Sequence, residues 1–337
     1  MQDNYLGNGI MRLGKKIAVF GGSGFIGREV GYALAHAGYA LTFYVRRPAR
    51  YRELTLLPNA RVRAWQPGDK VSTQAAVADH HILLNLLVDQ SDRLEAVAPE
   101  RFAEVGQSLQ QAASKAGIQR ILHLSYVDAD GKAGEGWCKQ LAVLESAMHG
   151  VACAQTTTLR TSLIIGAQDD TSSCYRDQLK RMAFVPVYGA EYRMQPLWVR
   201  DLARLMVDMV SHRESFGKKR IVVGDDTLTL KELALEVAEI MGIENAMVFS
   251  PCRLNARLLS ALGPLSPIKS LHPAQLVTLR GDRVVDNVDF EAQFGFKPTE
   301  VEVALSTYVT PHDIRHRYHF FRKEAGRDLS ELPKELL

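Results

Sequence analysis

A cluster of glycines near the start of the chain is the sequence feature with the clearest chemical meaning. The segment Gly21-Gly-Ser-Gly24-Phe-Ile-Gly27 satisfies both the G-x-G-x-x-G and the wider G-x-x-G-x-x-G spacing. Such glycines allow a tight turn, let the backbone approach a pyrophosphate and let a helix pack closely on a strand. The free amides and positive dipole end of that helix would face the phosphates. The pattern predicts a dinucleotide site, against the alternative of a plain turn, formed by Gly21, Ser23, Gly24, Phe25, Ile26 and Gly27.

Two arginines follow the second predicted strand, in Val45-Arg46-Arg47-Pro48. A site specific for NAD places Asp or Glu at this point, on the ribose hydroxyls. A guanidinium instead matches the geometry and charge of a 2′-phosphate, which a carboxylate would repel. Arg46 and Arg47 therefore predict NADPH as the cofactor, and the alternative is that both belong to a solvated loop.

Two further polar residues follow predicted strands, and ligands of open α/β sheets bind at strand ends. Asp69 comes after the third strand, where its carboxylate could accept from the adenine amino group, although composition alone indicates a turn. Ser125 ends the fifth strand in Leu122-His-Leu-Ser125-Tyr126, where a hydroxyl would face the nicotinamide. The alternative for Ser125 is a serine with no role beyond the strand end.

The histidines do not predict a metal site. His80 and His81 are adjacent, so on a strand they would point to opposite faces and could not hold one ion. His312, His316 and His319 have helical spacing, which can place two imidazoles on one metal. Because no Cys or acidic residue stands at a matched position, and Arg and Lys surround them, we expect no metal.

The elements that would position these residues alternate between strand and helix patterns. Residues 16–20 are apolar and β-branched, which predicts a strand, and the amphipathic stretch 25–37 predicts a helix that ends before Gly38. Further strand patterns cover residues 40–45, 61–65, 82–88, 118–126, 151–160 and 220–223. This alternation predicts an α/β fold of the Rossmann type, with a doubly wound parallel sheet.

The second half of the chain is less regular. Residues 161–200 have little periodicity and contain prolines and glycine, which predicts loops over the strand ends. Thr229-Leu-Lys-Glu232 is a capping box that opens a helix through Met241. We expect a Rossmann domain and a smaller, mostly helical C-terminal region that completes a cleft. The predicted bounds are 14–165 with 195–225 returning to it, then 166–194 and 226–310, and a basic tail at 311–337.

Composition narrows the classes of function. The 337 residues include 41 basic and 38 acidic side chains, and the net charge of +3 argues against a nucleic-acid surface. The four cysteines form no C-x-x-C pair, which is typical of reduced thiols. No apolar run approaches the roughly 18 residues of a membrane span. We expect a cytoplasmic protein.

Taken together, these motifs resemble the extended or atypical short-chain dehydrogenase/reductase superfamily, and more closely the NADPH-binding accessory subunits of respiratory complex I and their bacterial relatives. The likeness runs from about residue 16 to residue 309. The matching segments beyond the glycine loop are Asn85-Leu-Leu-Val88, Ile121-Leu-His-Leu-Ser125, Thr158-Leu-Arg160, Gln195-Pro-Leu-Trp-Val-Arg-Asp201 and Leu271-His-Pro-Ala-Gln-Leu276. The resemblance implies an NADPH site that includes Leu87. It also implies a protein partner or a peripheral complex at the inner membrane face.

One departure from the superfamily concerns its catalytic residues. Catalytic members carry Tyr and Lys four residues apart on one helix face, where Lys lowers the pKa of Tyr and holds the ribose. Lys139 matches the family lysine, but Glu135 stands at the tyrosine position, and no tyrosine lies between Asp128 and Arg160. The resemblance thus makes Lys139, Ser125 and Glu135 the candidate catalytic residues, without the usual proton donor.

Two functions fit this sequence. In the first, the chain binds NADPH as a structural or sensing ligand and meets a protein partner, which the missing tyrosine favours. In the second, it is an NADPH-dependent reductase or isomerase of a small carbonyl compound and uses Lys139, Glu135 or Tyr126 as its acid or base.

Overall fold

The computed structural model describes residues 15–132, 136–261, 270–286 and 288–310. Its centre is a seven-stranded sheet in the order β11-β6-β5-β4-β1-β2-β3. Every neighbouring pair in this sheet is parallel. The strands are β1 (Lys16–Phe20), β2 (Ala40–Val45), β3 (Ala60–Ala64), β4 (Ile82–Asn85), β5 (Arg120–Tyr126), β6 (Gln155–Thr161) and β11 (Lys219–Ile221). The predicted Rossmann-type sheet is confirmed.

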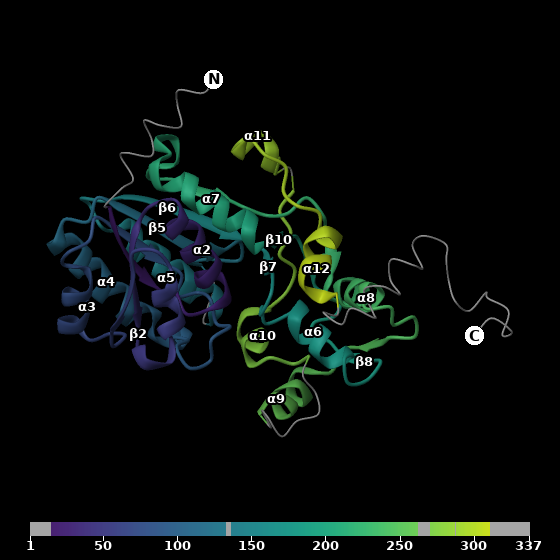
Figure 1. Cartoon of the computed structure of the whole chain (residues 1–337). Coiled ribbons are helices and arrows are strands. Elements are labelled where there is room, and N and C mark those ends of the chain that lie inside the picture. The colour runs from purple at the N-terminus through teal and green to yellow at the C-terminus, as the bar shows by residue number, and fades with distance from the viewer. Residues whose placement is uncertain (1–14, 133–135, 262–269, 287, 311–337) are drawn as a thin grey trace, which may run out of the picture.

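Helices pack on this sheet in two rows (Figure 1). One row pairs α2 (Phe25–His36) with α7 (Val199–Ser211). The other places α3 (Lys70–Val77), α4 (Phe102–Ala116) and α5 (Trp137–His149) side by side. Short 3₁₀ turns lie between these elements: η1 (Pro48–Arg50), η2 (Arg52–Leu56), η3 (Pro99–Arg101) and η4 (Arg213–Ser215). A parallel sheet covered on both faces has buried strands, and residues 17–20 of β1 are accordingly inaccessible to solvent.

The second region lies beside the carboxyl ends of these strands (Figure 1). Its helices are α6 (Ser172–Leu179), α8 (Leu230–Ile240), α9 (Arg253–Ala261), α10 (Pro273–Thr278), α11 (Phe290–Phe294) and α12 (Val301–Val309). Its short strands pair as β7 (Leu163–Ile165) with β10 (Pro196–Trp198), β8 (Phe184–Pro186) with β13 (Met247–Phe249), and β9 (Arg193–Met194) with β12 (Leu228–Thr229). The predicted capping box is present, because the Thr229 hydroxyl accepts from the amide of Glu232 at 3.1 Å.

Each region has its own apolar core. The first core joins the sheet to α2, α4, α5 and α7, and the second joins α6, α8 and α12 to the short strands. Phe290 of α11 belongs to the first core, although the segments on either side of it in the chain pack in the second. The guanidinium of Arg204 on α7 lies 4.1 Å from the centre of the Phe296 ring. This cation–π contact holds the segment after α11 against α7.

Two expectations about local structure were wrong. Residues 161–200 were predicted as loops, but they contain α6 and four short strands, which the second core stabilises. The strand predicted at 82–88 ends at Asn85. The Asn85 side-chain oxygen accepts from the amide of Leu87 at 3.1 Å, and this turn takes the chain out of the sheet.

Gly27, in the first turn of α2, lies directly against the backbone of the loop that joins β1 to α2. A Cβ at Gly27 would lie 2.4 Å from the Cα of Gly22 and 2.6 Å from the carbonyl oxygen of Gly21. Both neighbours are backbone atoms, so no side chain can move aside. The third glycine of the motif is therefore required by helix packing, as the spacing predicted.

We expect Gly27→Ala to destabilise the fold, because the loop or the first turn of α2 must shift to admit a methyl group. The free energy of unfolding in urea should fall by roughly 1–3 kcal/mol, as is usual for overpacking. Gly281→Ala is the matched control, since no described atom lies within 4 Å of a Cβ there. Equal stability of the two variants would show that the loop tolerates a side chain.

Candidate functional site

The glycine loop lies where β1 and β4 end side by side. Gly21 has a φ of +78°, and a Cβ there would lie 2.5 Å from the carbonyl carbon and oxygen of Leu86. The amide of Leu86 donates to the carbonyl of Phe20 at 2.8 Å, which keeps the two chains together beyond the sheet. The positive φ and the lack of space both exclude a side chain at Gly21.

The first amides of α2 bind side chains from a distant segment. Gly24 precedes the helix and offers no capping side chain of its own. The amide of Ile26 donates to Oδ2 of Asp89 at 3.1 Å, and the amide of Phe25 donates to Oγ of Ser91 at 3.1 Å. An oxyanion thus lies at the helix N-terminus, where the sequence predicted a pyrophosphate.

The predicted 2′-phosphate arginine also has an internal partner. The backbone amide of Arg46 donates to Oε2 of Glu95 at 2.6 Å, and Nε of Arg46 lies 3.5 Å from the same oxygen. Its guanidinium also donates to the carbonyls of Leu94 and Ala96. Arg47 is exposed. A carboxylate therefore holds one of the two arginines, and the other is open to solvent.

Asp69 acts as the N-cap of α3. Its carboxylate accepts from the amide of Val71 at 3.1 Å and from that of Ser72 at 3.3 Å. This is the local reason for an aspartate after Gly68, which has a φ of +84°. A contact between Asp69 and adenine stays a prediction.

The candidate catalytic residues lie on β5 and α5, which pack together. Ser125 is fully buried in β5, and Lys139 is half-buried in α5. Glu135 lies outside the described residues. The tyrosine next to Ser125, Tyr126, is partly buried, and desolvation raises its pKa well above the usual value of 10.0. This direction is opposite to that of a catalytic tyrosine activated by lysine.

An ion cluster around the buried carboxylate of Glu145 lies further along α5. The Glu145 carboxylate accepts from Nη2 of Arg160 at 2.6 Å and from Nζ of Lys219 at 2.6 Å. Burial by itself would raise the pKa of Glu145, but these hydrogen bonds outweigh it and hold the pKa below the usual value. Arg160, part of a segment that resembles the superfamily, therefore joins β6 to α5 and Glu145.

A small cavity lies where the two regions meet. Its volume is about 20 Å³, enough for about one water molecule. Side chains from both regions line it, among them Phe25, Asp89, Tyr126, Asp170, Thr171 and Arg283. This is the strand-end position at which doubly wound sheets bind ligands. A nicotinamide ring does not fit there unless a wall moves.

Arg283 is one of several cavity residues that the sequence did not predict; Asp89, Asp170 and Thr171 are others. Arg283 is 2% exposed, and its guanidinium donates to Oδ2 of Asp128 from Nη2 at 2.8 Å and from Nε at 3.1 Å. Its Cζ lies 4.4 Å from the centre of the Tyr126 ring. Arg283 follows α10 without any recognisable motif, so only the fold reveals the contact.

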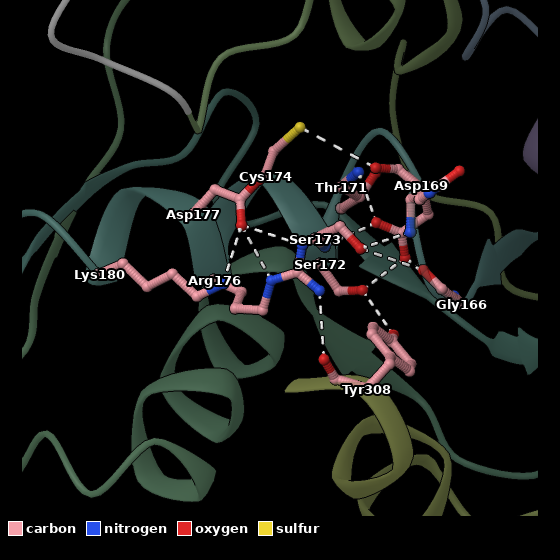
Figure 2. A network of polar contacts seen from close by, with 11 residues as sticks. Gly166, Asp169, Thr171, Ser172, Ser173, Cys174, Arg176, Asp177, Lys180 and Tyr308 are labelled. Atoms are coloured by element: carbon pink, nitrogen blue, oxygen red, sulfur yellow. Dashed lines mark hydrogen bonds and ion pairs between the residues drawn. The ribbon is translucent and has the colours of Figure 1, made fainter. Parts of the chain in front are cut away.

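The opposite wall is fixed by a polar network around Asp169 (Figure 2). The Asp169 carboxylate accepts from the amides of Gly166, Thr171 and Ser173 at 3.0, 3.1 and 2.7 Å and from the Ser172 hydroxyl at 2.5 Å. Ser172 also shares a 2.6 Å hydrogen bond with the hydroxyl of Tyr308 on α12. The loop that carries Asp170 into the cavity is therefore held at many points.

His80, His81 and His123 contact other parts of the fold rather than one another. His80 hydrogen-bonds Thr42 at 3.1 Å, and the ring of exposed His81 accepts from the amide of Lys16 at 3.2 Å. His123 is fully buried, which lowers its pKa to about 4. His312, His316 and His319 lie outside the described residues. In the ranges that the structure describes, no three His, Cys, Asp or Glu side chains are grouped as metal ligands would be.

Comparison with known proteins agrees with this geometry. Residues 21–158 match the family model described as NAD(P)H-binding. This segment is an NAD(P)H-binding domain. The match begins at the first glycine of the loop and ends within β6, so the NAD(P)H-binding domain contains Arg46, Asp69, Ser125 and Lys139.

Relatives over a longer stretch confirm the resemblance to complex I accessory subunits. The chain is 25% identical over 267 residues to subunit 9 of the NADH dehydrogenase [ubiquinone] 1 alpha subcomplex of Mus musculus mitochondria, covering 76% of this chain and 68% of that protein. The identity to the Dictyostelium discoideum subunit is 23% over 226 residues, which cover 64% of this chain and 60% of that protein.

Solved structures share the fold at lower identity. An NADPH-dependent quinone oxidoreductase from Escherichia coli, complexed with NADPH, has a TM-score of 0.64 at 20% identity and covers 86% of this chain and 99% of that chain. The UDP-glucose 4-epimerase of Thermotoga maritima has a TM-score of 0.65 at 17% identity and covers 92% of this chain and 99% of that chain. The NAD(P)H-binding domain and the second region together thus reproduce an architecture found in oxidoreductases and epimerases.

We expect the Asp169 carboxyl to make the free energy of unfolding decrease as the pH rises. Burial raises its pKa from 3.8 to about 6, so the folded state binds this proton more tightly than the unfolded state. Its contribution is fully present below about pH 4 and is lost as the pH rises through 6. Relative to Asp169→Asn, the native chain should lose roughly 3 kcal/mol of unfolding free energy between pH 4 and pH 7.

Urea unfolding at several pH values measures this difference. Asp177→Asn is the control, because it makes the same change from carboxylate to amide at a half-exposed position on α6. A gap between native and Asp169→Asn that stays constant with pH would contradict the assignment.

Proposed function

We propose that the chain is an NADP(H)-binding protein that acts through its bound cofactor and a protein partner. The observation that carries the proposal is the N-terminus of α2, which already holds a carboxylate on the amide of Ile26. A helix end that binds one oxyanion is suited to another, and the surrounding glycines place no side chain of their own between the backbone and a pyrophosphate.

The arrangement of the other predicted residues supports this cofactor. Residues 21–27 would hold the pyrophosphate, and Arg46 and Arg47 at the end of β2 would meet the 2′-phosphate. Asp69 lies beyond β3, where it would face the adenine. Leu87, Ser125 and Lys139 would border the nicotinamide ribose and ring. The bound cofactor would supply a hydride, and these side chains would position it.

A role in binding rather than turnover is supported by the missing proton donor. Glu135 stands where catalytic relatives carry a tyrosine, and desolvation shifts the pKa of the partly buried Tyr126 away from physiological pH. The mammalian relative is by name a subunit of an NADH dehydrogenase, which supports a protein complex as the partner. We propose a position on the inner membrane face; no helix among the described residues is long and apolar enough to cross a bilayer.

The alternative is an NADPH-dependent reductase or isomerase of a small carbonyl compound. One observation favours it: Tyr126 and Asp170, a hydroxyl and a carboxyl, line the same cavity beside the predicted nicotinamide position. Burial raises the pKa of Asp170, as expected of a carboxyl that could donate a proton near neutral pH.

We expect NADPH to bind more tightly than NADH, and Arg46→Ala to weaken NADPH selectively. A charge-assisted hydrogen bond to the 2′-phosphate contributes roughly 1.5–3 kcal/mol, or about tenfold or more in affinity. Calorimetry with both cofactors measures this, with exposed Arg61→Ala on β3 as the control. Equal losses for NADPH and NADH would remove Arg46 from this role.

We expect NADPH binding and turnover to be separable. Lys139→Ala should weaken the cofactor, whereas Glu135→Gln should leave its affinity nearly unchanged, and the native chain should oxidise NADPH barely above background with a carbonyl panel. Under the alternative, removing an essential acid or base costs about 10²–10⁴ in rate. Robust NADPH oxidation that collapses in Glu135→Gln would overturn the binding-protein proposal.

A further inference from the structure

The segment that follows β4 crosses the predicted cofactor site. Residues 89–96, called the acidic strap from here on, begin at the N-terminus of α2 and end beside β2. Three acids lie in the strap: Asp89, Asp92 and Glu95. Each of them accepts a hydrogen bond from a group outside the strap. The strap therefore touches the fold at three separate points along the cofactor path.

The inner contact is made by Asp89. Its Oδ2 accepts from the amide of Ile26 at 3.1 Å, and a Cβ on Gly24 would lie 2.1 Å from the same oxygen. Its Oδ1 accepts from the amide of Ser91 at 2.9 Å, and Ser91 in turn accepts from the amide of Phe25. The carboxylate thus lies against the helix start, in the space that a pyrophosphate would need.

The outer contact is made by Glu95. Its Oε2 accepts from the amide of Arg46 at 2.6 Å and lies 3.5 Å from the Nε of that residue. Between the two ends, Asp92 accepts from the hydroxyl of Tyr51 at 2.7 Å. The Glu95 carboxylate therefore binds Arg46, the arginine that was predicted to meet the 2′-phosphate. The Asp89 carboxylate lies at the predicted pyrophosphate position at the same time.

The two acids at the ends of the strap, Asp89 and Glu95, are carboxyl groups removed from solvent. Asp89 is 7% exposed, and burial raises its pKa to about 6 while the carboxylate of Asp170 faces it across the cavity. The Glu95 side chain is 7% exposed, and within the described part of the chain its Oε1 has no hydrogen-bond partner. Burying a carboxylate in this way costs free energy. A ligand phosphate that binds the same hydrogen-bond donors would therefore displace these carboxylates at a low cost.

We propose that the acidic strap is a built-in substitute for the phosphates of the cofactor, and that NADPH binds only when the strap leaves the site. Asp89 stands in for the pyrophosphate on α2, and Glu95 stands in for the 2′-phosphate on Arg46. This inference rests on the proposed function. The strap lowers affinity for any dinucleotide through Asp89, and for NADPH in particular through Glu95.

Affinity measurements on charge-removing variants test the proposal. Asp89→Asn should tighten NADPH and NADH alike, and Glu95→Gln should tighten NADPH by about tenfold with little effect on NADH, since each removes one charge-assisted contact. Exposed Glu100→Gln, just beyond the strap in η3, makes the same charge change and should alter neither affinity. Calorimetry on the full chain gives all values.

Proteolysis provides a readout that needs no variant. Arg93 is exposed in the middle of the strap, and displacement should make the following peptide bond a better substrate for trypsin. NADPH should therefore accelerate cleavage of the native chain after Arg93 severalfold. Unchanged cleavage, or protection by NADPH, would show that the strap stays in place and would overturn the proposal.

The outcomes separate this inference from the proposed function. If the native chain and all three variants bind NADPH with one affinity, the strap is no competitor, while NADPH binding stands. If none of the folded proteins binds NADPH or NADH, the proposed function itself fails. Tighter binding by Asp89→Asn and Glu95→Gln but not by Glu100→Gln supports both.

Discussion

The first turn of α2 imposes the constraint on which this molecule depends, because its free amides must bind an oxygen acceptor. The residue at the N-cap position is Gly24, which has no side chain to accept from them. The acceptors therefore come from Asp89 and Ser91, more than 60 residues away. The parallel pairing of β4 with β1 brings the segment after β4 to the start of α2.

The two walls of the cleft differ in how they are held. The loop around Asp169 is fixed by hydrogen bonds to backbone amides on several residues and by the link from Ser172 to Tyr308 (Figure 2). The strap is held at its acids: Asp89 is a buried carboxyl whose pKa is raised by burial, and the Oε1 atom of Glu95 has no hydrogen-bond partner within the described part of the chain. Segments with few compensated contacts open at lower free energy than densely bonded ones. The loop around Asp169 thus forms a rigid wall of the cleft, whereas the acidic strap forms a wall that can move.

Local sequence patterns were sufficient for the β1–α2–β2 unit and for the capping box at Thr229, because these depend on residues within a few positions of one another. They also located Arg46 at the correct strand end. The contacts of Arg46 with Glu95 and of Arg283 with Asp128 could not be predicted, since they join residues 49 and 155 positions apart. Helix α6 was missed because its burial, not its periodicity, stabilises it.

The pairing of Arg283 with Asp128 has a consequence for the order in which the protein forms. The two residues are separated by 155 positions, and the guanidinium also donates to the carbonyl of Ser162. During synthesis, the sheet strands β1 to β6 emerge and can pack before residue 283 leaves the ribosome. Closing so long a loop is entropically costly and slow. The cleft is therefore completed after the sheet that supports it, and until then Asp128 lacks this partner.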